Sequence, residues 1–393
     1  MTTRFGRSML EHFALDPAIT YLNHGTVGAP PRRVLAVQQA IRDEIELQPS
    51  RYLLRELSEI RVGAPRAEPP RLRTAAAEVA AFFGARGEDL VFVDNATTGA
   101  NAVLRSIPFI AGDEILVTSL GYGGVANAAL YVARERGATL REVAISPAAT
   151  QPDEIVEAID AALGSRTRLA IIDHIASDSA LLLPVAEIAA RARAKGVPIF
   201  VDGAHAPGAI ALDLPSIGAD WYVGNLHKWA WAPRSTAILW VSPERQSTLH
   251  PAVISWGLDQ GFTTEFDLVG TRDPSPWLAA PAALELLAEF GAEEVRAYNH
   301  DLAFQAGERL AARWGTEFRT PRSMVASMVS VPLPARFGGI KADAARLRDL
   351  LLFEDGIELH IAARGDRLAA RVAIQIYNDL ADVDRLGEAI SRR

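Results

Sequence analysis

The sequence of 393 residues contains no cysteine. This absence excludes disulfides, thiolate zinc sites, iron–sulfur clusters and any thiol nucleophile. Lysine is also rare, because only Lys195, Lys228 and Lys341 occur and 37 of the 40 basic residues are therefore arginine. Any chemistry that needs a side-chain amine has three candidates.

Long apolar runs and dense basic runs are missing as well. No stretch of about 18 apolar residues could cross a membrane, and residues 1–10 are too polar for a signal sequence. The 48 acidic and 40 basic residues give a net charge of -8, which disfavours a nucleic-acid partner. We therefore expect a cytoplasmic protein that binds a small molecule and has no nucleic-acid partner and no membrane anchor.

The composition is that of a globular protein, with 49% hydrophobic and 22% charged residues. From residue 90 onward, short runs rich in Val, Ile and Leu alternate with Ala-rich segments of helical period, which is typical of βαβ units. We expect an α/β fold whose large domain has a mostly parallel seven-stranded sheet. The predicted strands are 90–94, 114–119, 140–145, 169–173, 198–202, 221–223 and 236–241, and the predicted helices are 72–83, 99–106, 125–136, 152–163 and 184–195.

The pattern changes after residue 261. A polar loop runs to residue 276, a long helical region covers 279–314, and shorter segments of both periods follow. We expect these segments to form a smaller C-terminal α+β domain. The predicted division is a large cofactor-binding domain over 16–262 and a small domain formed by 1–15 and 263–393.

Ligands of open α/β sheets bind beyond the carboxyl ends of the strands, so the residues that follow each strand carry most information. Small and hydroxyl residues at 95–99 open a helix whose free amides favour an anion such as phosphate. Asp202 ends one predicted strand, and Lys228 follows the next among aromatic residues that would lower its pKa by desolvation. Each feature alone also fits an ordinary helix cap, turn or surface lysine, but this ordered set is what pyridoxal phosphate requires.

Six motifs carry a resemblance to a known family. The chain resembles class V aminotransferase-like pyridoxal-phosphate enzymes, and most closely their isopenicillin N epimerase-like branch. The resemblance implies the aspartate-aminotransferase-like fold. The motifs are YLNHG at 21–25, NATTG at 95–99, VDGAHAPG at 201–208, GNLHKW at 224–229, GTRDP at 270–274 and QIYND at 375–379.

The resemblance implies a role for each residue that would contact the cofactor. Lys228 would form the Schiff base, and Asp202 would keep the pyridine nitrogen protonated so that the ring accepts electrons. Tyr122 would stack on the ring as a third catalytic residue. The remaining implied cofactor contacts are Thr97, Thr98, Asn225 and His227 at the phosphate, Ser177 and His205 at the ring hydroxyl, and Thr271, which would reach the phosphate of a second subunit in a homodimer.

The resemblance also implies an amino acid substrate. Arg371 matches the arginine that grips the substrate carboxylate with two parallel hydrogen bonds. Asn23 and His24 would flank the same carboxylate. Arg51 and Tyr52 fall where the epimerase-like branch has a basic–aromatic pair and are predicted substrate contacts.

The reaction itself stays open between several outcomes at Cα. Epimerisation needs Lys228 on one face and a second acid, Tyr122 or His24, on the other. Elimination at a C–S bond, decarboxylation, oxidation by dioxygen and transamination use the same frame. A desulfurase that stores sulfur on its own cysteine is excluded, because the chain has none.

Two other classes of protein compete with this interpretation. A metal-dependent hydrolase could use carboxylate and imidazole ligands at two neighbouring strand ends, although no compact metal-binding spacing occurs. A cofactor-binding regulator would be yellow without turnover. The candidate ligands of the hydrolase are Asp173, His174, Asp202 and His205.

Overall fold

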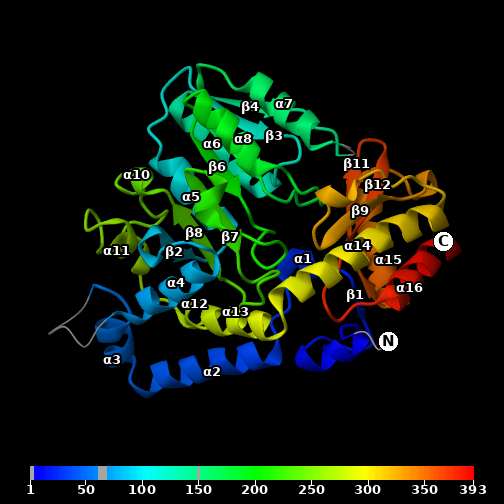
Figure 1. Cartoon of the computed structure of the whole chain (residues 1–393), viewed down its shortest axis with the longest axis horizontal. Helices are drawn as coiled ribbons and strands as arrows, with labels where there is room; N and C mark the ends of the chain where they lie inside the picture. The colour runs from blue at the N-terminus through cyan, green and yellow to red at the C-terminus, as the bar shows by residue number, and fades with distance from the viewer. Residues whose placement is uncertain (1–3, 61–68, 148–150) are drawn as a thin grey trace.

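The computed structural model describes residues 4–60, 69–147 and 151–393. Its larger part is built on a seven-stranded sheet of order β2-β8-β7-β6-β5-β3-β4 (Figure 1). All of these strands are parallel except β8, which is antiparallel to β2 and β7. The predicted α/β fold is confirmed, with strand ends that differ by one or two residues. The strands are β2 (Leu90–Val93), β3 (Glu114–Thr118), β4 (Thr139–Val143), β5 (Thr167–Asp173), β6 (Ile199–Asp202), β7 (Trp221–Asn225) and β8 (Ala237–Val241).

Helices cover both faces of this sheet because its strands, apart from the edge strand β4, are apolar and largely buried on both faces. Along β3, Leu116 enters one hydrophobic core, whereas Ile115 and Val117 enter the other. Helices α5 and α6 pack into the second core, and α4, α7 and α8 into the first. These helices are α4 (Arg71–Phe82), α5 (Ala96–Ser106), α6 (Gly123–Arg136), α7 (Pro152–Ala162) and α8 (Val185–Ala194).

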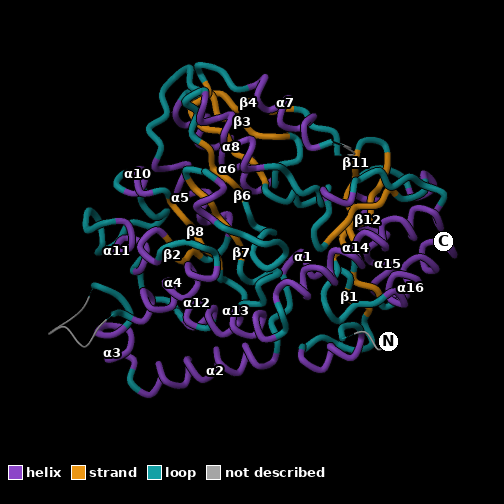
Figure 2. The backbone as a smooth tube through the Cα atoms, viewed as in Figure 1, coloured by secondary structure: helices purple, strands orange, loops and turns teal. Residues whose placement is uncertain are grey.

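The C-terminal part has its own antiparallel sheet of order β11-β12-β9 and its own core. Figure 2 shows its strands as a group separate from the large sheet, with helices alongside. Its hairpin turns at Gly365, and the strand pairing of β12 ends at Ala373. The elements are β9 (Met328–Pro332), β11 (His360–Arg364), β12 (Arg367–Ala373), α14 (Ala292–Trp314), α15 (Lys341–Asp355) and α16 (Leu380–Arg392).

The long helical region predicted over 279–314 is broken in two. Gly291 has a φ of 77° and separates α13 (Ala280–Glu289) from α14. Helix α13 contacts α4 of the large sheet, whereas α14 contacts β9 of the small one. Because of this break, α13 packs on the large domain and α14 packs on the C-terminal sheet.

The N-terminal segment ties the two sheets together. Strand β1 (Thr20–Tyr21) pairs in parallel with β10 (Ile357–Glu358) near the C-terminal sheet. After it, α1 (His24–Val27) contacts the segment that follows β7 through His24, and α2 (Arg32–Leu47) packs on α12 (Ser275–Leu278). The division at residues 16 and 262 stays a prediction. No helix in the described ranges combines the length and apolar character needed to span a membrane.

Candidate active site

A cavity of about 780 Å³ opens at the carboxyl edge of the large sheet, between that sheet and β12. Its walls come from the segments after β2, β3, β5, β6 and β7, as the position of the polar strand ends predicted. The lining includes these residues singled out from the sequence: Thr97, Thr98, Tyr122, Ser177, Asp202, His205, Asn225, His227, Lys228 and Arg371.

Lys228 follows β7 and is buried beside His205. Its Nζ lies 3.0 Å from His205 Nε2, and Trp229 Nε1 donates to His205 Nδ1 at 3.4 Å. Because Nδ1 accepts that hydrogen bond, the ring proton belongs on Nε2, which then points at a neutral amine. Burial lowers the pKa of Lys228 to about 7, and the charge of Arg371 lowers it further. The carboxylates of Asp202 and Asp173 raise this pKa and so oppose part of the decrease. A nucleophilic amine at neutral pH follows.

Two buried carboxyl groups lie beside this amine. Asp173 and Asp202 end neighbouring parallel strands and are paired in register. Asp202 Oδ1 accepts the backbone N–H of Ala204 at 3.0 Å, and Asp173 Oδ1 accepts that of Tyr122 at 3.3 Å. Burial raises the pKa of both groups, and the charge of Asp202 raises that of Asp173 further. A cationic ring between these strand ends would stabilise the ionised carboxylate of Asp202.

The N-terminus of α5 forms an anion cradle next to Lys228. Asn95 caps the helix by accepting the N–H of Thr98 at 2.9 Å, and Asn225 Oδ1 accepts the N–H of Ala96 at 2.9 Å. A Cβ on Gly99 would come within 2.7 Å of Val223, so glycine is what allows α5 to approach β7 this closely. A helix N-terminus with two threonine hydroxyls suits a phosphate group.

Arg371 is a buried cation that reaches the cavity from β12. Its Nη1 donates to the carbonyl of Ser177 at 2.8 Å, and its Nη2 donates to Thr26 Oγ1 at 2.6 Å and to Asn23 Oδ1 at 3.3 Å. Its Nε is buried without a partner, and no described carboxylate lies within ion-pair distance of the guanidinium. An uncompensated buried charge is costly, so this site calls for an anionic ligand.

Two residues predicted at the substrate carboxylate lie behind the cavity wall. Asn23 holds Arg371, as described, without lining the cavity itself. His24 is buried, with Nδ1 at 2.8 Å from the hydroxyl of Tyr377 and Nε2 at 3.1 Å from the carbonyl of Lys228. Burial lowers the pKa of His24 to about 4. Both residues therefore position the groups that line the cavity.

Three other predicted residues lie away from the cavity in this single chain. Arg51 Nε donates to Glu56 at 2.6 Å, and the ring of Tyr52 lies under the guanidinium of Arg71. Thr271 is exposed. Within one chain, Arg51 and Tyr52 do not lie in the cavity that holds Lys228. Their roles as substrate contacts stay predictions.

Two residues of the site were missed in the sequence analysis. Thr26, which accepts a hydrogen bond from Arg371, was not among the candidates. Asp173 was considered as a metal ligand but not as a residue of the cofactor cavity, where it lies beside Asp202. The second of these had a signal, because Asp173 ends a predicted strand next to that of Asp202. The first had none, because Thr26 and Arg371 are separated by 345 positions in the chain.

Comparison with known protein families identifies the family of this chain. The chain matches the family described as aminotransferase class-V over residues 70–386. The chain belongs to the class V aminotransferase family.

Two relatives and one solved structure are similar to this class V chain. It is 35% identical to an isopenicillin N epimerase of Amycolatopsis lactamdurans, covering 97% of this chain and 96% of that protein. It is 32% identical to a probable chloroplastic L-cysteine desulfhydrase of Arabidopsis thaliana, covering 96% of this chain and 83% of that protein. A solved structure of a C-DES mutant, with glycine covalently linked to its PLP cofactor, has a TM-score of 0.76 at 23% identity and covers 95% of this chain and 96% of its own.

This class V chain is a pyridoxal 5'-phosphate-dependent enzyme with the fold predicted for such enzymes. The residues of the cavity fit the cofactor, because an amine, a strand-end carboxylate and a helix N-terminus open into one space. The candidate metal ligands are not arranged as a metal site, although Asp173, Asp202 and His205 all line the cavity. His174 Nδ1 lies 2.9 Å from the hydroxyl of Tyr222, and no group of three or more His, Asp or Glu in the described residues is arranged to hold a metal ion.

Proposed function

We propose that this enzyme acts at the α-carbon of an amino acid and that its reaction is an epimerisation. The observation that carries the proposal is the convergence of Lys228, Asp202 and Arg371 on one cavity. Identity of 35% to an isopenicillin N epimerase over nearly the whole chain supports the choice of reaction.

Each wall of the cavity has a separate task in this proposal. Asp202 holds the proton of the ring nitrogen. Tyr122 covers the ring from the start of α6. Residues at the ends of β2, β5, β6 and β7 complete the seat, with Thr97, Thr98, Asn225 and His227 around the phosphate and Ser177 and His205 beside the ring hydroxyl. Bound pyridoxal phosphate supplies a ring that accepts the electron pair left at Cα when a bond to it breaks.

Arg371 binds and orients the amino acid. Its guanidinium is held by Thr26 and Ser177, and its unpartnered Nε leaves capacity for a carboxylate. A neutral Lys228 can then take the α-proton on its own side of the substrate.

Returning a proton on the opposite face requires a second acid. In the sheet order, β6 and β5 lie between β7, which precedes Lys228, and β3, which precedes Tyr122. Lys228 and Tyr122 therefore reach the cavity from strand ends on opposite sides of Asp202, which ends β6. Both ring nitrogens of His24 are engaged by neighbours, which favours Tyr122 as the second acid.

Elimination at a C–S bond is the second candidate. Its support is the 32% identity to a probable L-cysteine desulfhydrase. A lyase of this kind needs Lys228 and a sulfur leaving group but no cysteine of its own, so the cysteine-free sequence permits it.

Incubation of the cofactor-loaded enzyme with L- and D-amino acids in D₂O separates these reactions. The epimerase predicts exchange of the α-proton for deuterium with inversion, read by NMR and chiral chromatography. Release of pyruvate and sulfide from L-cysteine would select the lyase, and release of carbon dioxide or consumption of dioxygen would select decarboxylation or oxidation. Absence of any change at Cα with any of these substrates would contradict the proposal.

The lowered pKa of Lys228 predicts how cofactor capture depends on pH. Because the neutral amine is the nucleophile, capture by the cofactor-free protein should accelerate as the pH rises through about 7 and then level off. A free lysine side chain should accelerate only toward about 10.4. Stopped-flow absorbance with N-acetyl-lysine as control measures both, and equal profiles would show that burial does not activate the amine.

We infer a homodimer in which Thr271 completes the cofactor site of the second subunit. Thr271 is exposed in the single chain. The loop before α11 (Phe262–Asp267) also exposes apolar side chains, with Trp256 at 81%, Val253 at 58% and Ile254 at 53% exposure. Such apolar side chains on one short segment favour burial against a second copy. Light scattering should give the mass of two chains, and the mass of one chain for cofactor-loaded protein would contradict this assembly.

A further inference from the structure

A second hollow of about 600 Å³ adjoins the active-site cavity. The two share Tyr122, Ser177 and Asp178, so a group that extends past these residues leaves the first space and enters the second. The second hollow reaches the turn of the β11–β12 hairpin. Its other walls include Pro147 and, from the hairpin, Ala363, Arg364 and Gly365.

Arg364 is a cation without a carboxylate partner at the far end of this hollow. Its Nη2 is buried and makes no hydrogen bond within the described chain. Burial lowers its pKa to about 10, and Asp178 is the carboxylate that opposes this decrease. Asp178 is already bound by His360 Nε2 at 3.1 Å. The guanidinium therefore has unused capacity for an anion.

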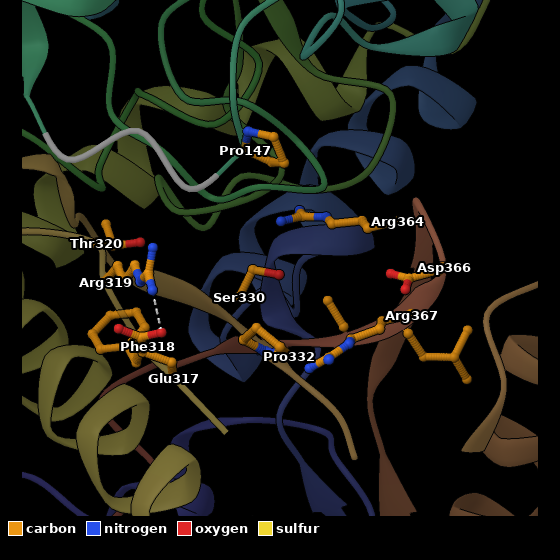
Figure 3. Close-up of a pocket in the computed structure, with 12 residues that line it drawn as sticks. Pro147, Glu317, Phe318, Arg319, Thr320, Ser330, Pro332, Arg364, Asp366 and Arg367 are labelled. Carbon is orange, nitrogen blue, oxygen red and sulfur yellow. Dashed lines mark hydrogen bonds and ion pairs between the residues drawn. The ribbon is translucent and has the colours of Figure 1, made fainter. Parts of the chain in front are cut away.

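Arg364 differs from the two arginines near it, Arg319 and Arg367, in its partners and its position. Besides the hollow, Arg364 lines a smaller neighbouring pocket of about 290 Å³, and Figure 3 shows its side chain entering that pocket from the hairpin, below Pro147. Arg319, on the opposite wall of this smaller pocket, is bonded to Glu317. Arg367 is exposed and pairs with Arg364 across the hairpin, but it does not line the hollow that joins the active site.

The hairpin register sets the distance between the two cationic sites. Arg371 lies opposite His360 on the neighbouring strand, and Arg364 is four residues further along. At about 3.4 Å per residue, the backbone positions of Arg364 and Arg371 are roughly 14 Å apart. Residues four apart on a strand share a face, so a ligand that contacts both guanidinium groups needs two anionic groups separated by on the order of 10 Å.

We propose that the natural substrate is an extended amino acid with a second anionic group at its far end, and that Arg364 binds this group while Arg371 binds the α-carboxylate. This inference rests on the proposed function and names its substrate class. The side chain of the substrate crosses the shared wall at Tyr122 and Ser177. Cysteine and alanine are too short to reach Arg364, so they would use half of the site.

Two matched dipeptides test the subsite on the cofactor-loaded enzyme. γ-L-Glutamylglycine offers a free amino acid at one end and a carboxylate roughly 9 Å away, and γ-L-glutamylglycinamide has the same shape without the distal charge. Calorimetric titration should show about 10-fold or tighter binding of the acid than of the amide. The preference should disappear in Arg364→Gln and persist in Arg367→Gln, which removes a charge from the same hairpin outside the hollow.

The outcomes separate this inference from the proposed function. Equal binding of the two dipeptides by the native enzyme, binding of neither, or a preference that survives in Arg364→Gln overturns the subsite, while α-proton exchange of alanine still supports the proposed function. Failure to exchange the α-proton of any amino acid overturns the proposed function itself. An acid-over-amide preference that depends on Arg364 alone supports the subsite.

Discussion

Replacing Lys228 with alanine is expected to lower turnover by about 10⁴-fold or more, because one substitution removes both the nucleophile and the base. Lys228 is the lysine that lines the cavity. The yellow absorbance of the captured cofactor should disappear at the same time. Steady-state kinetics on the reaction identified in D₂O, together with the absorbance spectrum, measure both effects.

Lys195→Ala is the matched control. Lys195 lies on the surface, where its Nζ contacts Asp160 at 2.9 Å. The control should keep the native spectrum and turnover. Native spectrum and turnover in Lys228→Ala would show that the amine is not used.

Substituting Asp202 with asparagine is expected to lower turnover by about 10³-fold with little change in the fold. Asparagine has the same shape and its amide oxygen can still accept the N–H of Ala204. It has no negative charge, however, and cannot hold a proton on the ring nitrogen. The loss should fall mainly on kcat, because the amino acid carboxylate binds at Arg371.

The neighbouring carboxyl group provides the comparison for Asp202. Asp173→Asn changes the adjacent strand end, whose contact is with the backbone of Tyr122. We expect a smaller loss than in Asp202→Asn. Equal losses would mean that the pair acts as one unit and that Asp202 has no separate role at the ring.

The large sheet could be predicted from the sequence because its strands are short, apolar and regularly spaced. The same spacing placed Asp202 and Lys228 at one edge, since parallel strands bring their carboxyl ends together. These two residues therefore needed no knowledge of distant contacts. Their convergence follows from the local pattern and the handedness of βαβ units.

Contacts between remote segments could not be predicted in this way. Thr26 reaches Arg371 because Asn23 forms a single parallel bridge with Ala373 at the end of β12, and a single bridge leaves no pattern in the sequence. Arg364 resembles any other arginine in a sequence that has 37 of them. Its unpartnered nitrogen becomes visible only when the hairpin is seen against the loop of Pro147.

Borohydride reduction of the cofactor-loaded enzyme, followed by peptide mapping, tests the central claim most directly. The chain offers Lys195, Lys228 and Lys341 as side-chain amines. The predicted result is a single reduced cofactor adduct on the peptide that contains Lys228. An adduct on Lys195 or Lys341 with Lys228 unmodified would contradict the account.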